Sequence, residues 1–261
     1  MKNQERKKRI VIKVGTHVLS QNGKLCKSRF EALCAFLAKL SEKNEVILVS
    51  SAAIVSGYSK IRLDKNILAN RQALAAVGQP ELMRTYSKHL KKHGKLAAQI
   101  LISGHNFDSR SATAKAKSAI DALLKNGIIP IINENDATAT DEIVFGDNDQ
   151  LSSRVAYYFD AYMLVILSDI DGYYDKDPKK FKNAKVRKIV SYIKEEELRL
   201  PSVAGSEFGT GGIVTKLKAA HFLLKRGKKM FMSSGFDLSD IESFMFKHKH
   251  KGGTLFVRKP S

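Results

Sequence analysis

Several residue types are scarce in this sequence, and their scarcity excludes several classes of protein. There is no tryptophan, and only two cysteines occur among the 261 residues. Cys26 and Cys34 form neither a CxxC pair nor a spaced quartet, so we expect reduced structural thiols rather than a metal centre. No apolar run approaches the roughly 20 residues that a membrane-spanning helix needs. The charged N-terminus leads only into a short apolar stretch broken by Lys13, so we expect no signal peptide and a cytoplasmic location.

Acidic residues are also scarce. The chain has 26 Asp and Glu residues against 45 Lys and Arg residues, which gives a formal net charge of +19. Such a charge suits nucleic acid, a membrane surface or an anionic small substrate. The lysines are scattered, however, and no aromatic residues interleave with them as a base-stacking platform requires. We therefore expect neither a membrane nor a nucleic-acid partner, while a basic nucleic-acid-binding protein stays the alternative from another class.

Apolar stretches and helical spacings alternate along the chain. Strands are predicted at residues 9–14, 45–50, 95–103, 128–132, 162–167, 231–232 and 254–257. Helices are predicted at residues 30–40, from residues 51–54 onward, at 65–93 with a break around 78–80, at 112–125, after residues 146–152 to about 159, at 190–198 and after residues 209–216, with a hairpin at 137–145. This order predicts an α/β protein with a parallel sheet, in which ligands lie beyond the carboxyl ends of the strands.

The scarce acidic residues gather at two places in the sequence. Asp147, Asn148 and Asp149 follow Gly146 directly, and Asn133-Glu134-Asn135-Asp136 ends a predicted strand. Asp and Asn are typical of a helix N-terminus, where they cap the backbone and suit the positive end of the dipole. The other interpretation is a site for a cationic group, either an ammonium or a metal ion. Both interpretations can hold at once.

Two lysines and a glycine-rich stretch point to phosphate chemistry. Lys13 ends an apolar strand just before Gly15, and is either a surface lysine that snorkels or an ammonium that faces a phosphate. Lys216 ends residues 209–216, a glycine-rich stretch that precedes a predicted helix and suits an anion. Asp169, at the end of another strand, is placed to hold the lysines or Mg²⁺. Because no His or Cys constellation supplies a nucleophile, the pattern favours direct phosphoryl transfer to a bound substrate.

A metal centre made of protein side chains is not expected. His89 and His93 are four residues apart, which is the spacing of a metal-binding pair on a helix. The surrounding lysines would repel a cation; they are Lys88, Lys91, Lys92 and Lys95.

The motifs together resemble the glutamate 5-kinase family of the amino acid kinase superfamily, in order and in spacing, over essentially the whole chain. They are Lys13-Val14-Gly15-Thr16, Val49-Ser50-Ser51-Ala52-Ala53-Ile54, Ala75-Ala76-Val77-Gly78-Gln79, Ile132-Asn133-Glu134-Asn135-Asp136, Gly146-Asp147-Asn148-Asp149, Leu167-Ser168-Asp169 and Gly209-Thr210-Gly211-Gly212 with Thr215-Lys216. The resemblance implies an enzyme that uses ATP with Mg²⁺ to phosphorylate the side-chain carboxylate of L-glutamate, the first step of proline biosynthesis. It also implies a three-layer α/β/α sandwich with a mostly parallel central sheet.

The resemblance assigns roles to individual residues. The catalytic residues it implies are Lys13, Lys216 and Asp169. The residues it implies for glutamate are Ser51, Asp136 and Asn148, with Asp147 and Asp149 shaping the same pocket. The residues it implies for ATP are Lys13, Ser168, Asp169, Thr210, Gly211, Gly212, Ile213, Val214, Thr215 and Lys216. Glutamate's α-ammonium would explain the acidic cluster, and its side-chain carboxylate, with an ordinary pKa near ~4.3, needs no general base at neutral pH.

The resemblance also sets expectations for the whole chain. It implies one domain over residues 1–261, with a glutamate-binding half at about 1–160, an ATP-binding half at about 161–261 and no PUA domain. A homo-oligomer, dimer or tetramer, is expected, as is handover of the product to glutamate-5-semialdehyde dehydrogenase. Two residues depart from the family pattern: Ala52 replaces a usual Gly, and His17 replaces a common Ser. Other superfamily members, such as an N-acetylglutamate or uridylate kinase, are the nearest alternatives.

Overall fold

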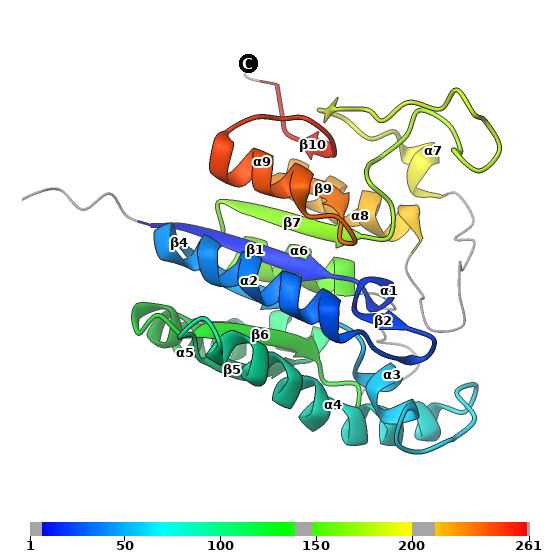
Figure 1. Ribbon diagram of the computed structural model, residues 1–261. Coiled ribbons are helices and arrows are strands. Elements are labelled where there is room, and N and C mark those ends of the chain that lie inside the picture. Colours follow the sequence, from blue (N-terminus) through cyan, green and yellow to red (C-terminus); the bar gives the residue numbers. More distant parts are fainter. Residues whose placement is uncertain (1–6, 139–147, 200–211, 260–261) are drawn as a thin grey trace, which may run out of the picture.

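A mostly parallel sheet of eight strands forms the centre of the computed structural model, which describes residues 7–138, 148–199 and 212–259 (Figure 1). The strands are β1 (Lys8–Val14), β4 (Asn44–Val49), β5 (Ala97–Ile102), β6 (Ile129–Glu134), β7 (Met163–Ser168), β8 (Ile189–Val190), β9 (Lys229–Ser234) and β10 (Thr254–Phe256). Their order in the sheet is β5-β6-β4-β1-β7-β9-β10-β8, and only β10 against β9 is recorded as an antiparallel pair among them. A separate hairpin joins β2 (Ser20–Gln21) and β3 (Lys24–Leu25).

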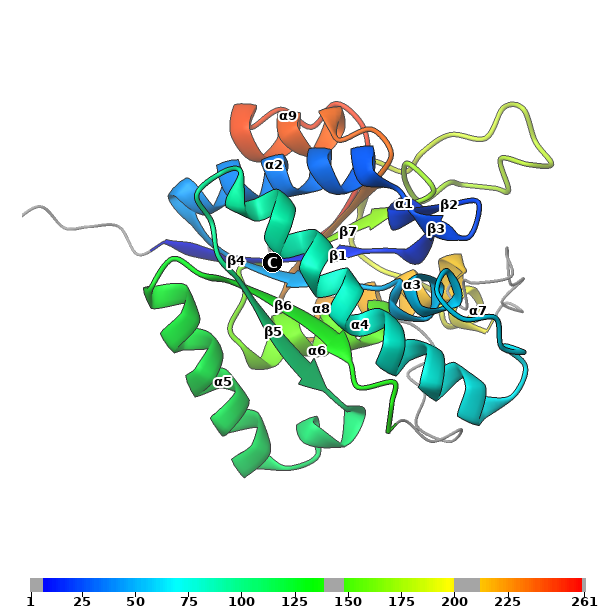
Figure 2. The same ribbon diagram turned by 60° about the horizontal axis from the view of Figure 1, so that its bottom comes forward.

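Helices cover both faces of this sheet. They are α1 (Thr16–Leu19), α2 (Lys27–Lys43), α3 (Ala53–Tyr58), α4 (Leu68–Lys91), α5 (Arg110–Lys125), α6 (Asn148–Tyr158), α7 (Glu195–Leu198), α8 (Ile213–Leu224) and α9 (Ser239–Lys247), with a 3-10 turn η1 at Gly104–Phe107. Helices α2, α4 and α9 lie on one face, and α5, α6 and α8 lie on the other (Figures 1 and 2). The predicted three-layer α/β/α sandwich is therefore confirmed.

The central strand β1 shows how the sequence builds both cores at once. Ile10 and Ile12 pack into the core beneath α2 and α4, whereas Val11 packs into the core beneath α6 and α8. Successive side chains of a strand point to opposite faces. Lys13 therefore shares the face of Val11, toward α6 and α8, and this fixed direction decides which residues it can meet.

The carboxyl ends of β1, β4, β6 and β7 meet along one edge of the sheet, because these neighbouring strands run parallel. The chain moves from β1 to β4 on one side and later reaches β7 on the other. Ligands of open α/β sheets bind at such a switch point. In the described ranges, no helix has the length and hydropathy that crossing a membrane requires.

The structure corrects two predicted elements. The predicted break near Pro80 is wrong, because α4 runs without interruption from Leu68 to Lys91. Packing outweighs the cost of a helical proline here: a Cβ on Gly78 would lie only 1.8 Å from the Ala53 carbonyl oxygen, so α4 rests directly on the backbone of α3. The helix predicted at 190–198 is also too long, since Val190 belongs to β8 and α7 begins at Glu195. The hairpin predicted at 137–145 lies mostly outside the described residues.

Ala52 has an unusual backbone conformation at the start of α3. Its φ is 81° and its ψ is 13°, in the left-handed region, and the residue is buried. A residue with a Cβ in this region carries a strain of about 1–2 kcal/mol that glycine avoids. The replacement of a usual Gly by Ala at this position therefore costs stability.

We predict that Ala52→Gly raises the free energy of unfolding by about 0.5–1 kcal/mol, since relief of strain exceeds the loss of one methyl group and the added freedom of the unfolded chain. Urea denaturation measures this change. The control is Ala122→Gly, at an exposed position inside α5, which should lower stability by about 0.5–1 kcal/mol. Equal destabilisation by both substitutions would contradict the claim that the backbone of Ala52 is strained.

Candidate active site

A buried carboxylate joins two lysines at the carboxyl edge of the sheet. Lys13 Nζ lies 2.6 Å from Asp149 Oδ1, and Lys216 Nζ lies 3.1 Å from Asp149 Oδ2. Asp149 is fully buried, while Lys13 and Lys216 are 4% and 5% exposed. The surface interpretation of Lys13 is therefore wrong. Ion pairs this deeply buried are costly to desolvate, so their presence is typical of a functional site rather than of a stability device.

Three elements that are distant in sequence place these groups. β1 ends at Lys13, α6 carries Asp149 in its first turn, and α8 carries Lys216 in its first turn. Both helix N-termini direct the positive ends of their dipoles toward this point. Thr215, also in α8, donates a hydrogen bond of 2.9 Å to Asp149 Oδ2. The resulting excess of positive charge suits an anion such as a phosphate.

Asn148 connects this cluster to the ends of β4 and β6. Its Nδ2 lies 3.0 Å from Ser51 Oγ, 2.5 Å from the Ser50 carbonyl oxygen and 2.9 Å from Asn133 Oδ1. Asn133 in turn donates a 2.9 Å hydrogen bond from Nδ2 to Gln79 Oε1 on α4. The structure thus brings Ser51 and Asn148 together, as the predicted shared pocket requires.

Two carboxyl groups follow at the end of β6, and their surroundings disfavour a negative charge. Burial raises the pKa of Glu134 to about 7, and the nearby charge of Asp136 adds to this shift. Burial also raises the pKa of Asp136 to about 6, although the charge of Arg71 opposes the shift. A cation bound here would stabilise both ionised forms. The sequence motif alone does not single out Glu134; its burial at the end of β6 is the feature that marks it.

Asp169 has different partners from those that the sequence suggested. Its Oδ2 lies 3.3 Å from His17 Nδ1, and its Oδ1 accepts a 2.9 Å hydrogen bond from Ser168 Oγ. The hydrogen bond with His17, the Ser168 hydroxyl and the charge of Lys216 hold the pKa of Asp169 well below its usual range. Asp149 is the residue that the structure records in contact with both lysines, and Asp169 acts on Lys216 through its charge. The sequence marked His17 only as a replacement for a common Ser of the family pattern. Its contact with Asp169 makes it part of the site.

The remaining predicted residues are divided between described and undescribed parts of the chain. Asp147, Thr210 and Gly211 lie outside the described residues. Gly212 is the N-cap of α8, and the other predicted residues form its first turn; they are Ile213, Val214, Thr215 and Lys216. Across residues 7–138, 148–199 and 212–259, no group of three or more His, Cys, Asp and Glu side chains is arranged to hold a metal ion.

Comparisons with known proteins agree with the fold and identify the family. Residues 8–233 match the amino acid kinase family. The structure resembles carbamate kinase from Giardia lamblia bound to AMP-PNP, with a TM-score of 0.67 and 15% identity over 97% of this chain and 99% of that chain. It also resembles UMP kinase from Ureaplasma parvum, with a TM-score of 0.65 and 16% identity over 97% and 100%. The chain belongs to the amino acid kinase family.

Within that family the similarity is to proteins named glutamate 5-kinase. The one from Wolinella succinogenes is 54% identical over 256 residues, which cover 96% of this chain and 98% of that protein. The one from Leishmania donovani is 50% identical over 254 residues, which cover 97% of each. The resemblance that the motifs predicted is therefore confirmed at the level of family.

Glu134 supplies a prediction for the pH dependence of stability. Its pKa is raised in the folded protein, so the folded state binds more protons than the unfolded state between about pH 4.3 and 7. The ligand-free protein should therefore lose stability as the pH rises through this range, by roughly 3–4 kcal/mol from this group. Asp136 contributes with the same sign.

We predict that Glu134→Gln flattens this dependence and raises the free energy of unfolding at pH 8 more than at pH 4.5. The amide can still accept the 3.3 Å hydrogen bond from the Gly104 backbone N–H. Urea denaturation at the two pH values measures the effect. The exposed Glu196→Gln is the control and should keep the wild-type dependence. If Glu134→Gln lowers stability equally at both pH values, the buried carboxyl group of Glu134 is not the source of the pH dependence.

Proposed function

We propose that this chain transfers the γ-phosphoryl group of ATP to the side-chain carboxylate of L-glutamate and forms L-glutamyl 5-phosphate. The observation that carries the proposal is the buried arrangement of Lys13, Asp149 and Lys216, together with the carboxyl groups of Glu134 and Asp136 that follow at the end of β6. One half of the site suits a phosphate, and the other half suits an ammonium. Similarity to the glutamate 5-kinases supports the same assignment.

The lysines would act on the charge of the transferring group. A carboxylate oxygen of glutamate attacks the γ-phosphorus and forms a new O–P bond, while the bond between that phosphorus and the β–γ bridging oxygen breaks and ADP leaves with the electron pair. Negative charge spreads over the phosphoryl oxygens during this step, and fixed ammonium groups stabilise it. Lys13 and Lys216, held by Asp149, are already in place. No proton has to be removed, because the acceptor carboxylate is ionised at neutral pH.

The other half of the site selects the substrate. Ser51 and Asn148 offer a hydroxyl and an amide at the ends of β4 and α6, and they would hydrogen-bond the substrate's polar groups. Glu134 and Asp136 lie where an α-ammonium would restore the charge that burial opposes. An acylated amine carries no positive charge, so N-acetylglutamate would leave these carboxyl groups without a cation. Free glutamate is therefore the better fit.

The nucleotide would lie along the N-terminus of α8 and the end of β7. Its proposed contacts are Lys13, Ser168, Asp169 and residues 210–216, of which 210 and 211 are outside the described residues. Mg²⁺ would arrive with ATP, since this ion keeps several waters and typically binds through phosphates and one or two carboxylates. Asp169, with its strongly acidic carboxyl group, fits a ligand or water-mediated contact of that kind. When bound, the ion would neutralise phosphate charge.

Three further expectations stay predictions: division of the domain near residue 160, a homo-oligomeric assembly, and transfer of the labile acyl phosphate to glutamate-5-semialdehyde dehydrogenase.

The direct test is to incubate the purified chain with ATP, Mg²⁺ and L-glutamate and to trap the acyl phosphate with hydroxylamine. We predict a hydroxamate signal with L-glutamate and a signal at least about tenfold weaker with N-acetylglutamate, because a well-placed charge contact is worth at least ~1.4 kcal/mol. UMP is assayed in parallel by ADP release. A stronger signal with N-acetylglutamate or UMP than with L-glutamate would overturn the substrate assignment. If none of the three acceptors supports ATP turnover, the proposed class of acceptor is wrong.

A further inference from the structure

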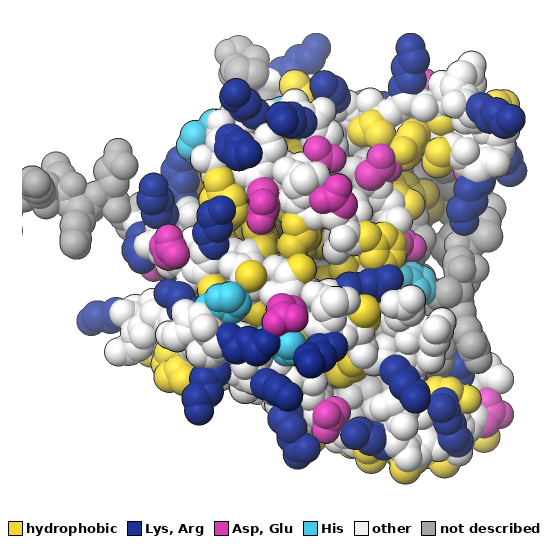
Figure 3. Space-filling model, in the orientation of Figure 1, with side chains coloured by type: hydrophobic (Ala, Val, Ile, Leu, Met, Phe, Trp, Pro, Cys, Tyr) yellow, Lys and Arg dark blue, Asp and Glu magenta, His cyan; other side chains and the backbone are white. Residues whose placement is uncertain are grey.

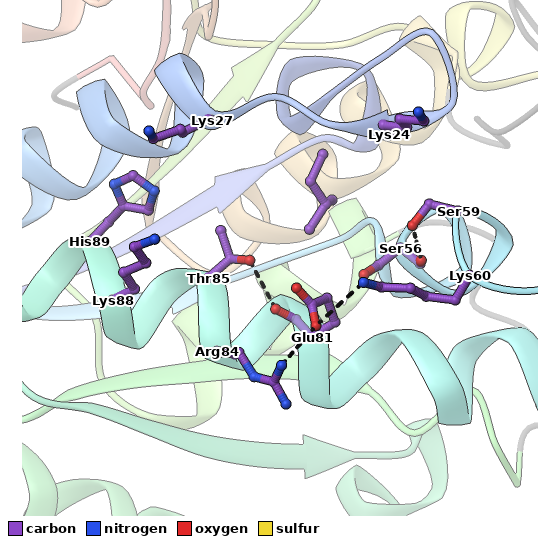
Figure 4. Close-up of a pocket in the computed structure, with 11 residues that line it drawn as sticks. Lys24, Lys27, Ser56, Ser59, Lys60, Glu81, Arg84, Thr85, Lys88 and His89 are labelled. Carbon is purple, nitrogen blue, oxygen red and sulfur yellow. Dashed lines mark hydrogen bonds and ion pairs between the residues drawn. The ribbon is translucent and has the colours of Figure 1, made fainter.

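A second concave site lies on the opposite face of the sheet from the paired lysines. It is a cavity of about 490 Å³ between the β2–β3 hairpin, the start of α2, and helices α3 and α4 (Figure 4). Its volume is within the ~300–1,000 Å³ typical of small-molecule sites. Ser56, which lines it, is on α3, five residues after Ser51. The cavity is thus separate from the phosphoryl-transfer site, but the helix that lines it begins directly after the segment that carries Ser51.

Cationic side chains dominate the lining of this cavity. They are Lys24, Lys27, Lys60, Arg84 and Lys88, against a single carboxylate, Glu81. Figure 3 shows Lys and Arg side chains gathered over α4 on this face. Like charges this close repel one another unless a counter-charge is bound.

The carboxylate of Glu81 compensates only part of this charge. Its Oε2 lies 3.4 Å from an Arg84 terminal nitrogen and 3.8 Å from Lys60 Nζ. Among the described residues, no carboxylate forms an ion pair with Lys24, Lys27 or Lys88. The lysines of the hairpin, α2 and α4 therefore line the cavity without an ion-paired carboxylate, and Glu31 acts on Lys27 through its charge from outside the lining.

Two buried polar atoms in the same lining have no hydrogen-bond partner within the described residues. They are Ser56 Oγ and His89 Nδ1, and their residues are 0% and 2% exposed. Buried polar atoms are nearly always satisfied by protein, by ordered water or by a ligand. A hydroxyl and an imidazole N–H can both donate hydrogen bonds to an oxyanion, which is the kind of ligand that the lysines also favour.

Burial and the charges of neighbouring residues shift the pKa of His89. Burial lowers the pKa of His89, and Lys92, Lys88 and Lys27 lower it further, while the carboxylate of Glu31 opposes them. A bound anion would reverse part of this effect, because it favours the protonated ring. The histidine therefore offers a signal at the cavity, on the other face of the sheet from Lys216.

We propose that this cavity is a binding site for a small polyanion that carries phosphate groups or several carboxylates. The ligand would lie between the lysines of the hairpin, α2 and α4, and would accept hydrogen bonds from Ser56 and His89. It would join three elements that now repel one another, and so would stabilise the fold. This site is additional to the proposed kinase activity and does not depend on it.

The test is isothermal titration calorimetry with inorganic phosphate and, separately, with citrate, at an ionic strength kept constant with sodium chloride. We expect saturable binding of at least one of them, and the better binder identifies the ligand as phosphate-bearing or polycarboxylate. Arg84→Ala combined with Lys88→Ala should weaken binding about tenfold, since loss of each partly exposed charge should weaken it about threefold. The matched control, Lys115→Ala with Lys125→Ala on α5, removes the same charge and should change binding less than about twofold.

Two further measurements locate the anion. The NMR signals of the His89 ring should move on titration, and the pKa of this ring should rise. Lys216→Ala should keep this response, since Lys216 lies on the other face of the sheet. Loss of all anion binding in Lys216→Ala, equal weakening by both double variants, or binding of a single-stranded oligonucleotide without binding of either small anion would overturn the proposal. Lys27→Ala gives an independent check should the α4 double variant fold poorly.

Discussion

The attraction between Asp149 and two buried lysines is the interaction on which the site depends. Two ammonium groups cannot lie close together in a protein interior unless a carboxylate offsets their repulsion. Asp149 supplies that charge from the first turn of α6, and it contacts Lys13 from β1 and Lys216 from α8. One side chain thus fixes the relative positions of a strand and two helices. The sum of the three charges stays positive, which leaves the cluster able to bind a phosphate.

Cationic and acidic side chains occupy different parts of the site, because different strands of the sheet end there. The lysines lie where β1, α6 and α8 meet, and the carboxyl groups of Glu134 and Asp136 lie at the end of β6. Asn148 lies between them and joins the two halves through Ser51 and Asn133. A substrate that is cationic at one end and accepts a phosphoryl group at the other fits this arrangement. Glutamate has both properties.

Local sequence patterns predicted much of this structure. They failed where the conformation or the contacts of a residue depend on segments that are distant in the sequence. The strands, Lys13, Lys216 and the Ser51–Asn148 pairing followed from motifs and from the meeting of strand ends. The contact of Asp149 with both lysines depends on how α6 packs against β1, which no local pattern encodes. Likewise, α4 passes through Pro80 because Gly78 packs on α3. The cationic cavity was beyond prediction, since its lysines come from four separate segments.

The central claim is that Asp149 positions the lysines for the transition state, and kinetics of Asp149→Asn test it most directly. Fixed charges of this kind typically contribute about 10²–10³ in kcat. We therefore expect kcat for glutamate phosphorylation to fall by about that factor, with KM for glutamate changed less than about threefold, while the exposed Asp160→Asn stays at the wild-type rate. Folding of the variant is checked by its thermal unfolding. A folded Asp149→Asn enzyme with unchanged kcat would contradict the account.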